Sequence, residues 1–95
     1  MFVLVVYDIS DNDVRRRLSD YLKAKGFTRI QRSAFIGRPM PTTLKDVERI
    51  LGKFVKEPTD VIQVFPITEN TLKYAKTYGN PLSVIHEDGE RYVVA

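Results

Sequence analysis

The first hydrophobic stretch of the chain is an unbroken run, FVLVVY at residues 2–7, of aliphatic, β-branched and aromatic residues. Such a run predicts a strand, and the lack of any polar residue within it indicates that both faces of the strand are buried. The run ends in one aspartate, Asp8, and a polar turn follows. A single carboxylate at the end of a buried strand needs an explanation.

A helix is predicted over residues 13–25, because apolar residues recur there on one stripe at helical spacing. Asp11 or Asn12 can cap its N-terminus, and Gly26 can take the left-handed conformation that ends a helix. The stripe leaves a triple arginine on the solvent side, close to the N-terminal end. Its apolar members are Val14, Leu18, Tyr21 and Leu22.

The next segment, FTRIQRSAFIGR at residues 27–38, alternates with a period of two and predicts a second strand. A guanidinium can pair with phosphate and a ring can stack on a base, so one face of this strand is a plausible surface for nucleic acid. The other interpretation is that Phe35 belongs to the hydrophobic core and Gln31 is an interface amide. The row on that face consists of Arg29, Gln31, Ser33 and Phe35.

A second helix is expected at residues 44–56, with Thr43 as its N-cap. The apolar run DVIQVFPI at residues 60–67 predicts a further strand. Proline cannot donate a hydrogen bond to a neighbouring strand, so Pro66 should interrupt this strand or confine it to a sheet edge.

The last part of the chain predicts a short helix and a hairpin. The helix, ENTLKYAKTYG, should end at Gly79, and the tail after Pro81 should form two strands that turn at residues 88–89, an Asp-Gly pair. His86, the one histidine of the chain, falls in this hairpin and offers no base close to Asp8.

The order of elements is β-α-β-α-β with one or two further strands, and the length is that of one domain, residues 1–95. The predicted fold class is α+β, a ferredoxin-like β-α-β-β-α-β sandwich with an extra C-terminal strand. Two helices cover only one face of such a sheet, whereas the first strand is apolar on both. We therefore expect a two-fold homodimer packed through the open faces, in which residues 91–95 add a strand to the partner's sheet. The alternative is that the tail hairpin folds back over the open face.

Composition is that of an ordinary globular chain, with 43% apolar and 28% charged residues. The chain has no cysteine, which excludes disulfides and thiolate metal sites. The N-terminal apolar run is too short to span a membrane and no basic segment precedes it, so we expect neither signal peptide nor anchor, and a cytoplasmic protein without a membrane partner.

Charge is distributed unevenly, although the net value is only +3. Residues 14–38 contain eight basic residues and one acid, Asp20. A local positive field of this kind suits a polyanion, and nucleic acid is the commonest one in a cell. The alternative is a solvated helix face in a basic protein.

Asp8 lies where open α/β sheets collect reactive groups, beyond the carboxyl end of a strand. Proteins commonly hold magnesium with one or two carboxylates together with substrate phosphates. A nearby two-fold axis would bring a second Asp8, and the pair could share one ion. The alternative is that Asp8 caps the following turn by accepting backbone hydrogen bonds from residues 10–12.

Several motifs together resemble the Cas2 family, the small CRISPR-associated protein of the adaptation machinery. A YD pair followed by a basic helix and by Q-x-S-x-F is specific as a set. One departure is that Arg16 completes a triple arginine and the family pattern assigns it no role. The motifs cover nearly the whole chain: YDIS, VRRRLSDYL, GFTRIQRSAFIG, LKDVERIL and FPITEN.

The resemblance implies a dimeric, magnesium-dependent endonuclease that acts on single-stranded RNA or double-stranded DNA in the spacer-acquisition stage of antiviral defence. It also implies association with the CRISPR integrase. Asp8 matches the family's metal-binding and catalytic aspartate, and Tyr7 is the catalytic-site tyrosine that precedes it. The positions implied to bind nucleic acid are Arg15, Arg17, Arg29 and Phe35.

The residues themselves leave more than one function open. No serine–histidine constellation exists, so a triad mechanism is excluded, and a metal-assisted attack with arginines on the flanking phosphates remains. One ion shared by two carboxylates is a small set of groups for a catalytic site. The alternatives are a non-catalytic scaffold that holds duplex DNA between integrase subunits, and a toxin-type endoribonuclease.

Overall fold

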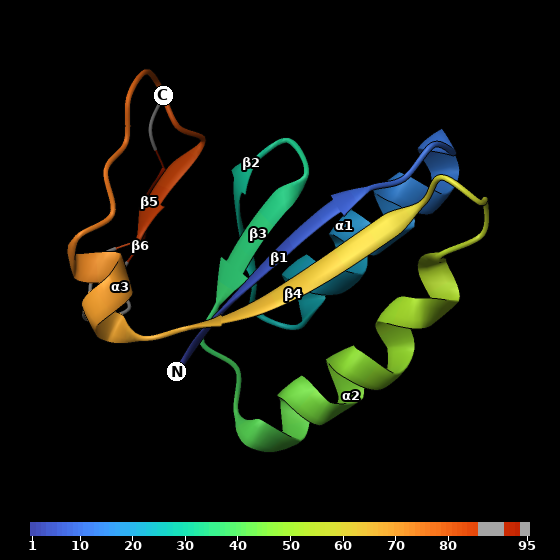
Figure 1. Cartoon of the computed structure of the whole chain (residues 1–95), viewed down its shortest axis with the longest axis horizontal. Coiled ribbons are helices and arrows are strands. Elements are labelled where there is room, and N and C mark those ends of the chain that lie inside the picture. The colour runs from blue at the N-terminus through green and yellow to red at the C-terminus, as the bar shows by residue number, and fades with distance from the viewer. Residues whose placement is uncertain (86–90, 94–95) are drawn as a thin grey trace.

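The computed structural model describes residues 1–85 and 91–93. Four strands form one antiparallel sheet in the order β2-β3-β1-β4, and α1 and α2 lie on the same side of it (Figure 1). This β-α-β-β-α-β arrangement is ferredoxin-like, so the predicted fold class is confirmed. The elements are β1 Phe2–Asp8, α1 Asn12–Ala24, β2 Thr28–Gln31, β3 Ala34–Gly37, α2 Pro41–Leu51 and β4 Val61–Ile67.

Strand β1 is central, with β3 on one side and β4 on the other. Because side chains alternate along a strand, Val3, Val5 and Tyr7 face the helices, where they are buried. Leu4 and Val6 lie on the opposite face and are only half-buried. The sheet therefore has one face packed into a core and one partly open face, on which Phe2 and Ile36 are nevertheless buried. The helices contribute Val14, Leu18, Leu22, Val47 and Leu51 to that core.

Helix α1 has the predicted position and the predicted cap. The carboxylate of Asp11 accepts hydrogen bonds from the backbone N–H groups of Asp13 and Val14, at 2.9 and 3.0 Å. These groups have no partner within the helix, so the side chain stabilises its first turn. At the other end Gly26 has φ of 91°, the left-handed conformation expected of it.

Residues 27–38 form a hairpin, and the prediction of one continuous strand is wrong. Arg32 and Ser33 make the turn between β2 and β3, with a register irregularity between Arg29 and Gln31. A period-two pattern does not distinguish one long strand from two strands joined by a tight turn. The hairpin places Arg29 directly opposite Phe35, which a single strand could not do.

Helix α2 begins at Pro41, three residues before the predicted start, and Thr43 lies inside it. Proline suits the first turn of a helix, because its ring fixes a helical φ and its missing N–H would be unpaired there in any case. The chain then tightens into a 3₁₀ turn, η1 (Gly52–Phe54). Strand β4 lies at the edge of the four-stranded sheet and contains Pro66, as predicted.

The short third helix, α3 (Glu69–Lys73), is capped by the hydroxyl of Thr68 and ends well before Gly79. Gly79 does have a positive φ, of 90°, but in the loop that follows. The prediction of a helix reaching Gly79 is therefore wrong. No helix among the described residues has the length and apolar character needed to cross a membrane.

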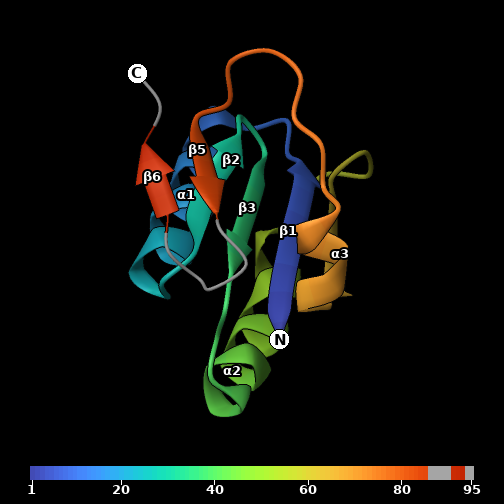
Figure 2. The ribbon, with the colours of Figure 1, turned by 90° about the vertical axis from the view of Figure 1, so that its left-hand side faces the viewer.

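The tail forms the predicted hairpin, with β5 (Ser83–Ile85) antiparallel to β6 (Arg91–Val93). Its expected turn and His86 lie outside the described residues. The Ser83 hydroxyl donates to the carbonyl oxygen of Arg29, so β5 lies beside β2 (Figure 2). The alternative in which the tail folds back is thus partly realised, at the β2 side of the open face. Addition of the tail to a partner's sheet stays a prediction.

A candidate nucleic-acid interface

Residues of α1 and β2, with the turn after β2, line a groove of about 330 Å³. Five of its residues are basic and one, Asp20, is acidic. Positive side chains gathered around a hollow attract a polyanion more strongly than the same charges spread over a surface. The groove therefore gives the predicted basic segment a definite shape. It is lined by Asn12, Arg15, Arg16, Ser19, Asp20, Lys23, Arg29 and Arg32.

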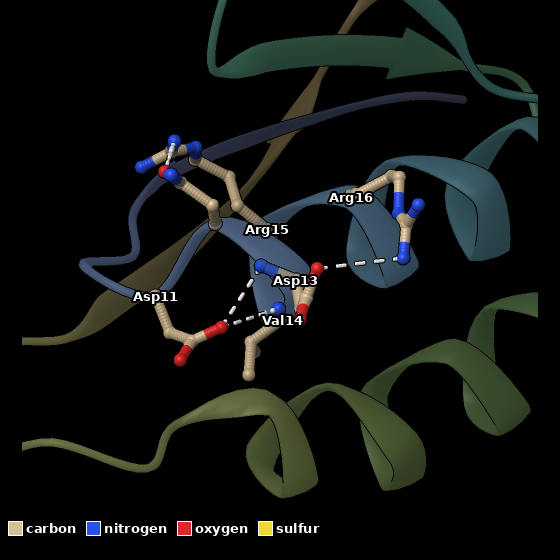
Figure 3. A network of polar contacts seen from close by, with 6 residues as sticks. Asp11, Asp13, Val14, Arg15 and Arg16 are labelled. Atoms are coloured by element: carbon tan, nitrogen blue, oxygen red, sulfur yellow. Dashed lines mark hydrogen bonds and ion pairs between the residues drawn. The ribbon is translucent and has the colours of Figure 1, made fainter.

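Arg15 is anchored to the turn between β1 and α1. Its Nη1 donates to the carbonyl oxygen of Ile9 at 2.9 Å, and its Nη2 donates to the side-chain oxygen of Asn12. Figure 3 shows the contact between Arg15 and Asn12 beside the Asp11 cap of the helix. The two hydrogen bonds fix the Arg15 guanidinium next to the turn that follows Asp8.

The other two arginines of the triple have different settings. Arg16 lines the groove and pairs with Asp13 at 3.5 Å (Figure 3), but both side chains are exposed, so the pair contributes little to stability. Arg17 is also exposed and is not among the residues lining the groove. Each residue of a helix turns by about 100°, which separates Arg17 from the stripe that contains Arg16. The structure does not bring Arg17 together with the other predicted contacts.

Arg29 reaches from β2 to the middle of α1. Its Nη2 donates to the hydroxyl of Ser19 at 2.7 Å, and its guanidinium carbon lies 5.2 Å from the centre of the Phe35 ring. The Nε atom is buried and has no hydrogen-bond partner among the described residues. Arg29 is therefore tightly packed, while still lining the groove.

Phe35 does not provide a stacking surface, and its predicted contact with nucleic acid is wrong. Its side chain is 0% exposed and belongs to the core. The ring stacks on that of Tyr7, with centres 6.2 Å apart. The core interpretation of Phe35 is the one that the structure supports.

Tyr7 is likewise a core residue within this chain, and its catalytic role stays a prediction. The side chain is 4% exposed and faces the helices, with its hydroxyl buried and without a partner among the described residues. Because side chains alternate along β1, Asp8 lies on the opposite face. The two side chains therefore point to opposite faces of the sheet.

Asp8 is exposed at the end of β1, opposite Val61. None of the hydrogen bonds and ion pairs of the described residues involves its carboxylate. The backbone N–H of Ser10 bonds to Asp60, and those of Asp13 and Val14 bond to Asp11. The alternative in which Asp8 caps the turn is therefore wrong.

Asp60 is the residue that holds this turn, and the sequence analysis missed it. One carboxylate oxygen accepts from the backbone N–H and the hydroxyl of Ser10, each at 3.0 Å. The other accepts from the backbone N–H groups of Glu57 and Lys56, at 2.9 and 3.1 Å. The hydrogen bonds from Glu57 and Ser10 favour the charged form and lower the pKa of Asp60 to about 2. The only signal in the sequence was a turn-forming aspartate before a strand.

Asp8 offers one carboxylate to a cation. Among residues 1–85 and 91–93, no group of three or more acidic or histidine side chains could hold a metal. Magnesium keeps several of its waters and often uses only one or two carboxylates, so an exposed and unengaged aspartate fits it. A second carboxylate would have to come from another copy of the chain.

A ferredoxin-like sheet with a basic groove and one strand-end carboxylate defines a small α+β protein suited to polyanions. The model of the family described as CRISPR associated protein Cas2 matches residues 1–75. The chain belongs to this CRISPR-associated Cas2 family.

Relatives of known name agree with this assignment. The chain is 40% identical over 81 residues to CRISPR-associated endoribonuclease Cas2 2 of Pyrobaculum aerophilum, covering 85% of this chain and 89% of the relative. It is 36% identical over 94 residues to CRISPR-associated endoribonuclease Cas2 1 of Archaeoglobus fulgidus, covering 98% and 100%. A third relative, of Thermoproteus tenax, is a CRISPR-associated endonuclease Cas1/endonuclease Cas2 fusion, 42% identical over 72 residues that make up 76% of this chain and 27% of the fusion.

Solved structures share the fold. The crystal structure of Streptococcus pyogenes Cas2 has a TM-score of 0.72 and 26% identity, covering 83% of this chain and 100% of that one. A hypothetical protein of Thermus thermophilus has a TM-score of 0.71 and 25% identity, covering 84% and 92%.

Proposed function

We propose that this chain is a magnesium-dependent endonuclease that cleaves RNA or DNA in the cytoplasm during CRISPR spacer acquisition. The observation that carries the proposal is the position of Asp8. Its carboxylate is exposed, has no partner among the described residues, and lies on the same face of β1 as the apolar Leu4 and Val6. The names of two relatives, which are called endoribonucleases, favour RNA as one substrate.

The open face of the sheet supports a two-fold dimer as the functional unit. Leu4 and Val6 are half-buried there, and on β4 the side chains of Val61 and Phe65 are each 44% exposed. Figure 2 views this face, with β3 and β1 passing between the tail hairpin and α3. A second copy would cover the exposed apolar surface, and the hydrophobic effect would favour the association. Since Asp8 lies on the same face, the dimer would bring two carboxylates together.

Two copies of Asp8 would hold the magnesium ion. When bound, magnesium activates a water molecule and neutralises charge on the phosphate that is cleaved. The carboxylates themselves orient the site and supply negative charge without any proton transfer.

The basic groove would bind the phosphates that flank the scissile bond. Arg15 donates a hydrogen bond to the carbonyl oxygen of Ile9, the residue directly after Asp8. A phosphate bound by Arg15 would therefore lie near the turn that follows the proposed metal ligand. Arg29 lines the same groove from β2. A guanidinium can form two parallel hydrogen bonds with a phosphate, which fixes its position as well as its charge.

The test is cleavage of labelled single-stranded RNA and double-stranded DNA, with magnesium or with a chelator, by the wild type and by Asp8→Asn. The neutral amide is a poor ligand for a hard cation, so Asp8→Asn should lose all magnesium-dependent cleavage while it folds and still binds nucleic acid. Dimerisation should be unchanged or stronger, because two facing carboxylates repel each other.

Asp46→Asn is a matched control, since Asp46 is an exposed aspartate on α2, where it pairs with Arg49. This variant should cleave as the wild type does. Cleavage by Asp8→Asn at the wild-type rate would show that the catalytic assignment is wrong.

A second candidate function is a non-catalytic scaffold that bridges integrase subunits on duplex DNA. It is favoured by the Thermoproteus tenax relative, whose name joins Cas1 and Cas2 in one chain, and by the single carboxylate that each copy supplies. In this case the wild type would cleave neither substrate. Sedimentation with a Cas1 protein and DNA would detect a complex that Asp8→Asn leaves intact.

A further inference from the structure

Arg29 is held from two sides by buried residues. On one side the hydroxyl of Ser19 accepts a hydrogen bond from Nη2 at 2.7 Å, and Ser19 is only 4% exposed. On the other side the guanidinium lies over the ring of Phe35, 5.2 Å from its centre, and that ring is fully buried. The backbone of Arg29 is fixed as well, since its carbonyl oxygen accepts from Ser83.

This arrangement is not explained by stability. The Nε of Arg29 is buried without a partner among the described residues. A buried charged donor without a partner destabilises a fold, and an apolar side chain of similar length would fill the same space without that cost. The buried, unpaired Nε therefore indicates that Arg29 serves a function at the groove that it lines.

We infer that Ser19 is a positioning residue for Arg29, and that the Phe35 ring is the platform on which the guanidinium rests. Together they fix the guanidinium at the groove before a phosphate arrives. A free arginine side chain loses much rotamer freedom on binding, and one that is already held loses less. The inference rests on the proposed binding of nucleic acid in the groove, and it gives buried Phe35 an indirect part in that binding.

Arg16 lines the same groove without such support. Its only partner among the described residues is the exposed Asp13, at 3.5 Å. Arg16 thus serves as the comparison: Ser19 should be coupled energetically to Arg29 and independent of Arg16.

The experiment measures the affinity of the full chain for a fluorescent single-stranded RNA and a fluorescent DNA duplex by anisotropy. Ser19→Ala should weaken binding by about three- to tenfold, the range of one lost hydrogen bond. In the Arg29→Ala background, Ser19→Ala should change the affinity no further. In the Arg16→Ala background it should weaken binding by the same factor as in the wild type.

Phe35→Leu is the second variant, because it removes the ring and keeps an apolar side chain in the core. It should weaken binding in the wild-type background and have no further effect with Arg29→Ala. Circular dichroism and thermal denaturation show whether each variant folds. If Phe35→Leu does not fold, the Ser19 and Arg29 cycle decides the question alone.

The outcomes separate this inference from the proposed function. If Arg29→Ala binds as tightly as the wild type, the proposal that nucleic acid binds in the groove is wrong. If Arg29→Ala weakens binding and Ser19→Ala does not, the groove stands and the positioning role is wrong. The role is equally wrong if Ser19→Ala weakens binding as strongly without Arg29 as with it, since a purely structural serine would behave in that way.

Discussion

At the scale of single residues, carboxylates a few positions apart in the sequence have different roles because their surroundings differ. Asp11 caps α1, whereas Asp8 is exposed and unengaged among the described residues. Asp60, fifty residues from Ser10, holds the turn between β1 and α1 with one carboxylate oxygen and the segment before β4 with the other. The candidate metal ligand is thus free because other carboxylates satisfy the backbone around it.

Asp60 should make the stability of the protein depend on pH in the acid range. Its pKa is lowered to about 2 from an ordinary value of 3.8, so its contribution to stability is complete above about pH 4 and is lost as the pH falls toward 2. Asp60→Asn should lower the melting temperature at pH 7. It should also lose that part of the acid dependence, which melting curves at pH 7, 4 and 2.5 would measure.

Asp46→Asn is the control for this prediction as well, because Asp46 is exposed and bonds to no backbone N–H among the described residues. Its melting curve should follow that of the wild type at each pH. Equal melting temperatures for Asp60→Asn and wild type at pH 7 would contradict the role assigned to Asp60.

At the scale of elements, the pairing of α1 with β2 creates the basic groove. Helix α1 contributes Arg15, Arg16 and Lys23 to it, and β2 contributes Arg29. Packing brings Arg15 and Arg29 to one hollow and leaves Arg17 outside it. The sequence predicted a basic region, and the packing of two elements selected its members.

Binding of nucleic acid should therefore weaken steeply with salt, and the groove arginines should set the slope. Each phosphate contact releases counterions, so Arg15→Ala or Arg29→Ala should reduce the slope of log affinity against log salt by about 1 and weaken binding to all sequences alike. Anisotropy titrations from low to moderate salt would measure it.

Arg17→Ala separates the groove from a general basic surface. The family resemblance predicted a contact at Arg17, but Arg17 does not line the groove. If the groove alone binds the substrate, the slope for Arg17→Ala should equal that of the wild type. If the slope does not change in Arg15→Ala or Arg29→Ala, the proposal that the groove binds phosphates is wrong.

At the scale of the whole molecule, the sheet has one face packed and one largely open. The helices bury Val3 and Val5, whereas Leu4 and Val6 on the other face are only half-buried. The described part of the tail contacts the β2 side, through the hydrogen bond from Ser83 to Arg29. A second copy of the chain remains the cover that we propose for the rest.

The dimer should be stable at micromolar concentration, and a charge on the open face should disrupt it. Val6→Asp places a carboxylate in the proposed interface, where desolvation opposes burial, so it should give a folded monomer. Analytical ultracentrifugation would measure the mass, and circular dichroism would confirm the fold.

Val55→Asp is the matched control, because Val55 is 42% exposed after η1, on the side of the sheet that carries the helices. This variant should remain a dimer. A wild type that sediments as a monomer would contradict the dimer and also the model in which two copies of Asp8 share one ion.

The sequence by itself determined the features that depend on neighbours along the chain. The spacing of apolar residues predicted β1 and α1, Asp11 was identified as a possible cap, Pro66 placed β4 at an edge, and the apolar composition of β1 indicated an open face. These are local effects, because they follow from alternation, helical periodicity and the geometry of single residues.

Only the tertiary structure decided which side chains meet across the fold. The hairpin at residues 27–38 set Arg29 opposite Phe35, Asp60 came to Ser10 from across the chain, and Tyr7 and Phe35 proved to be core residues. A local pattern does not encode such contacts, since one alternating segment can be a strand or a hairpin with a different register. Register and packing decide whether an aromatic ring faces a ligand or supports the residue that does.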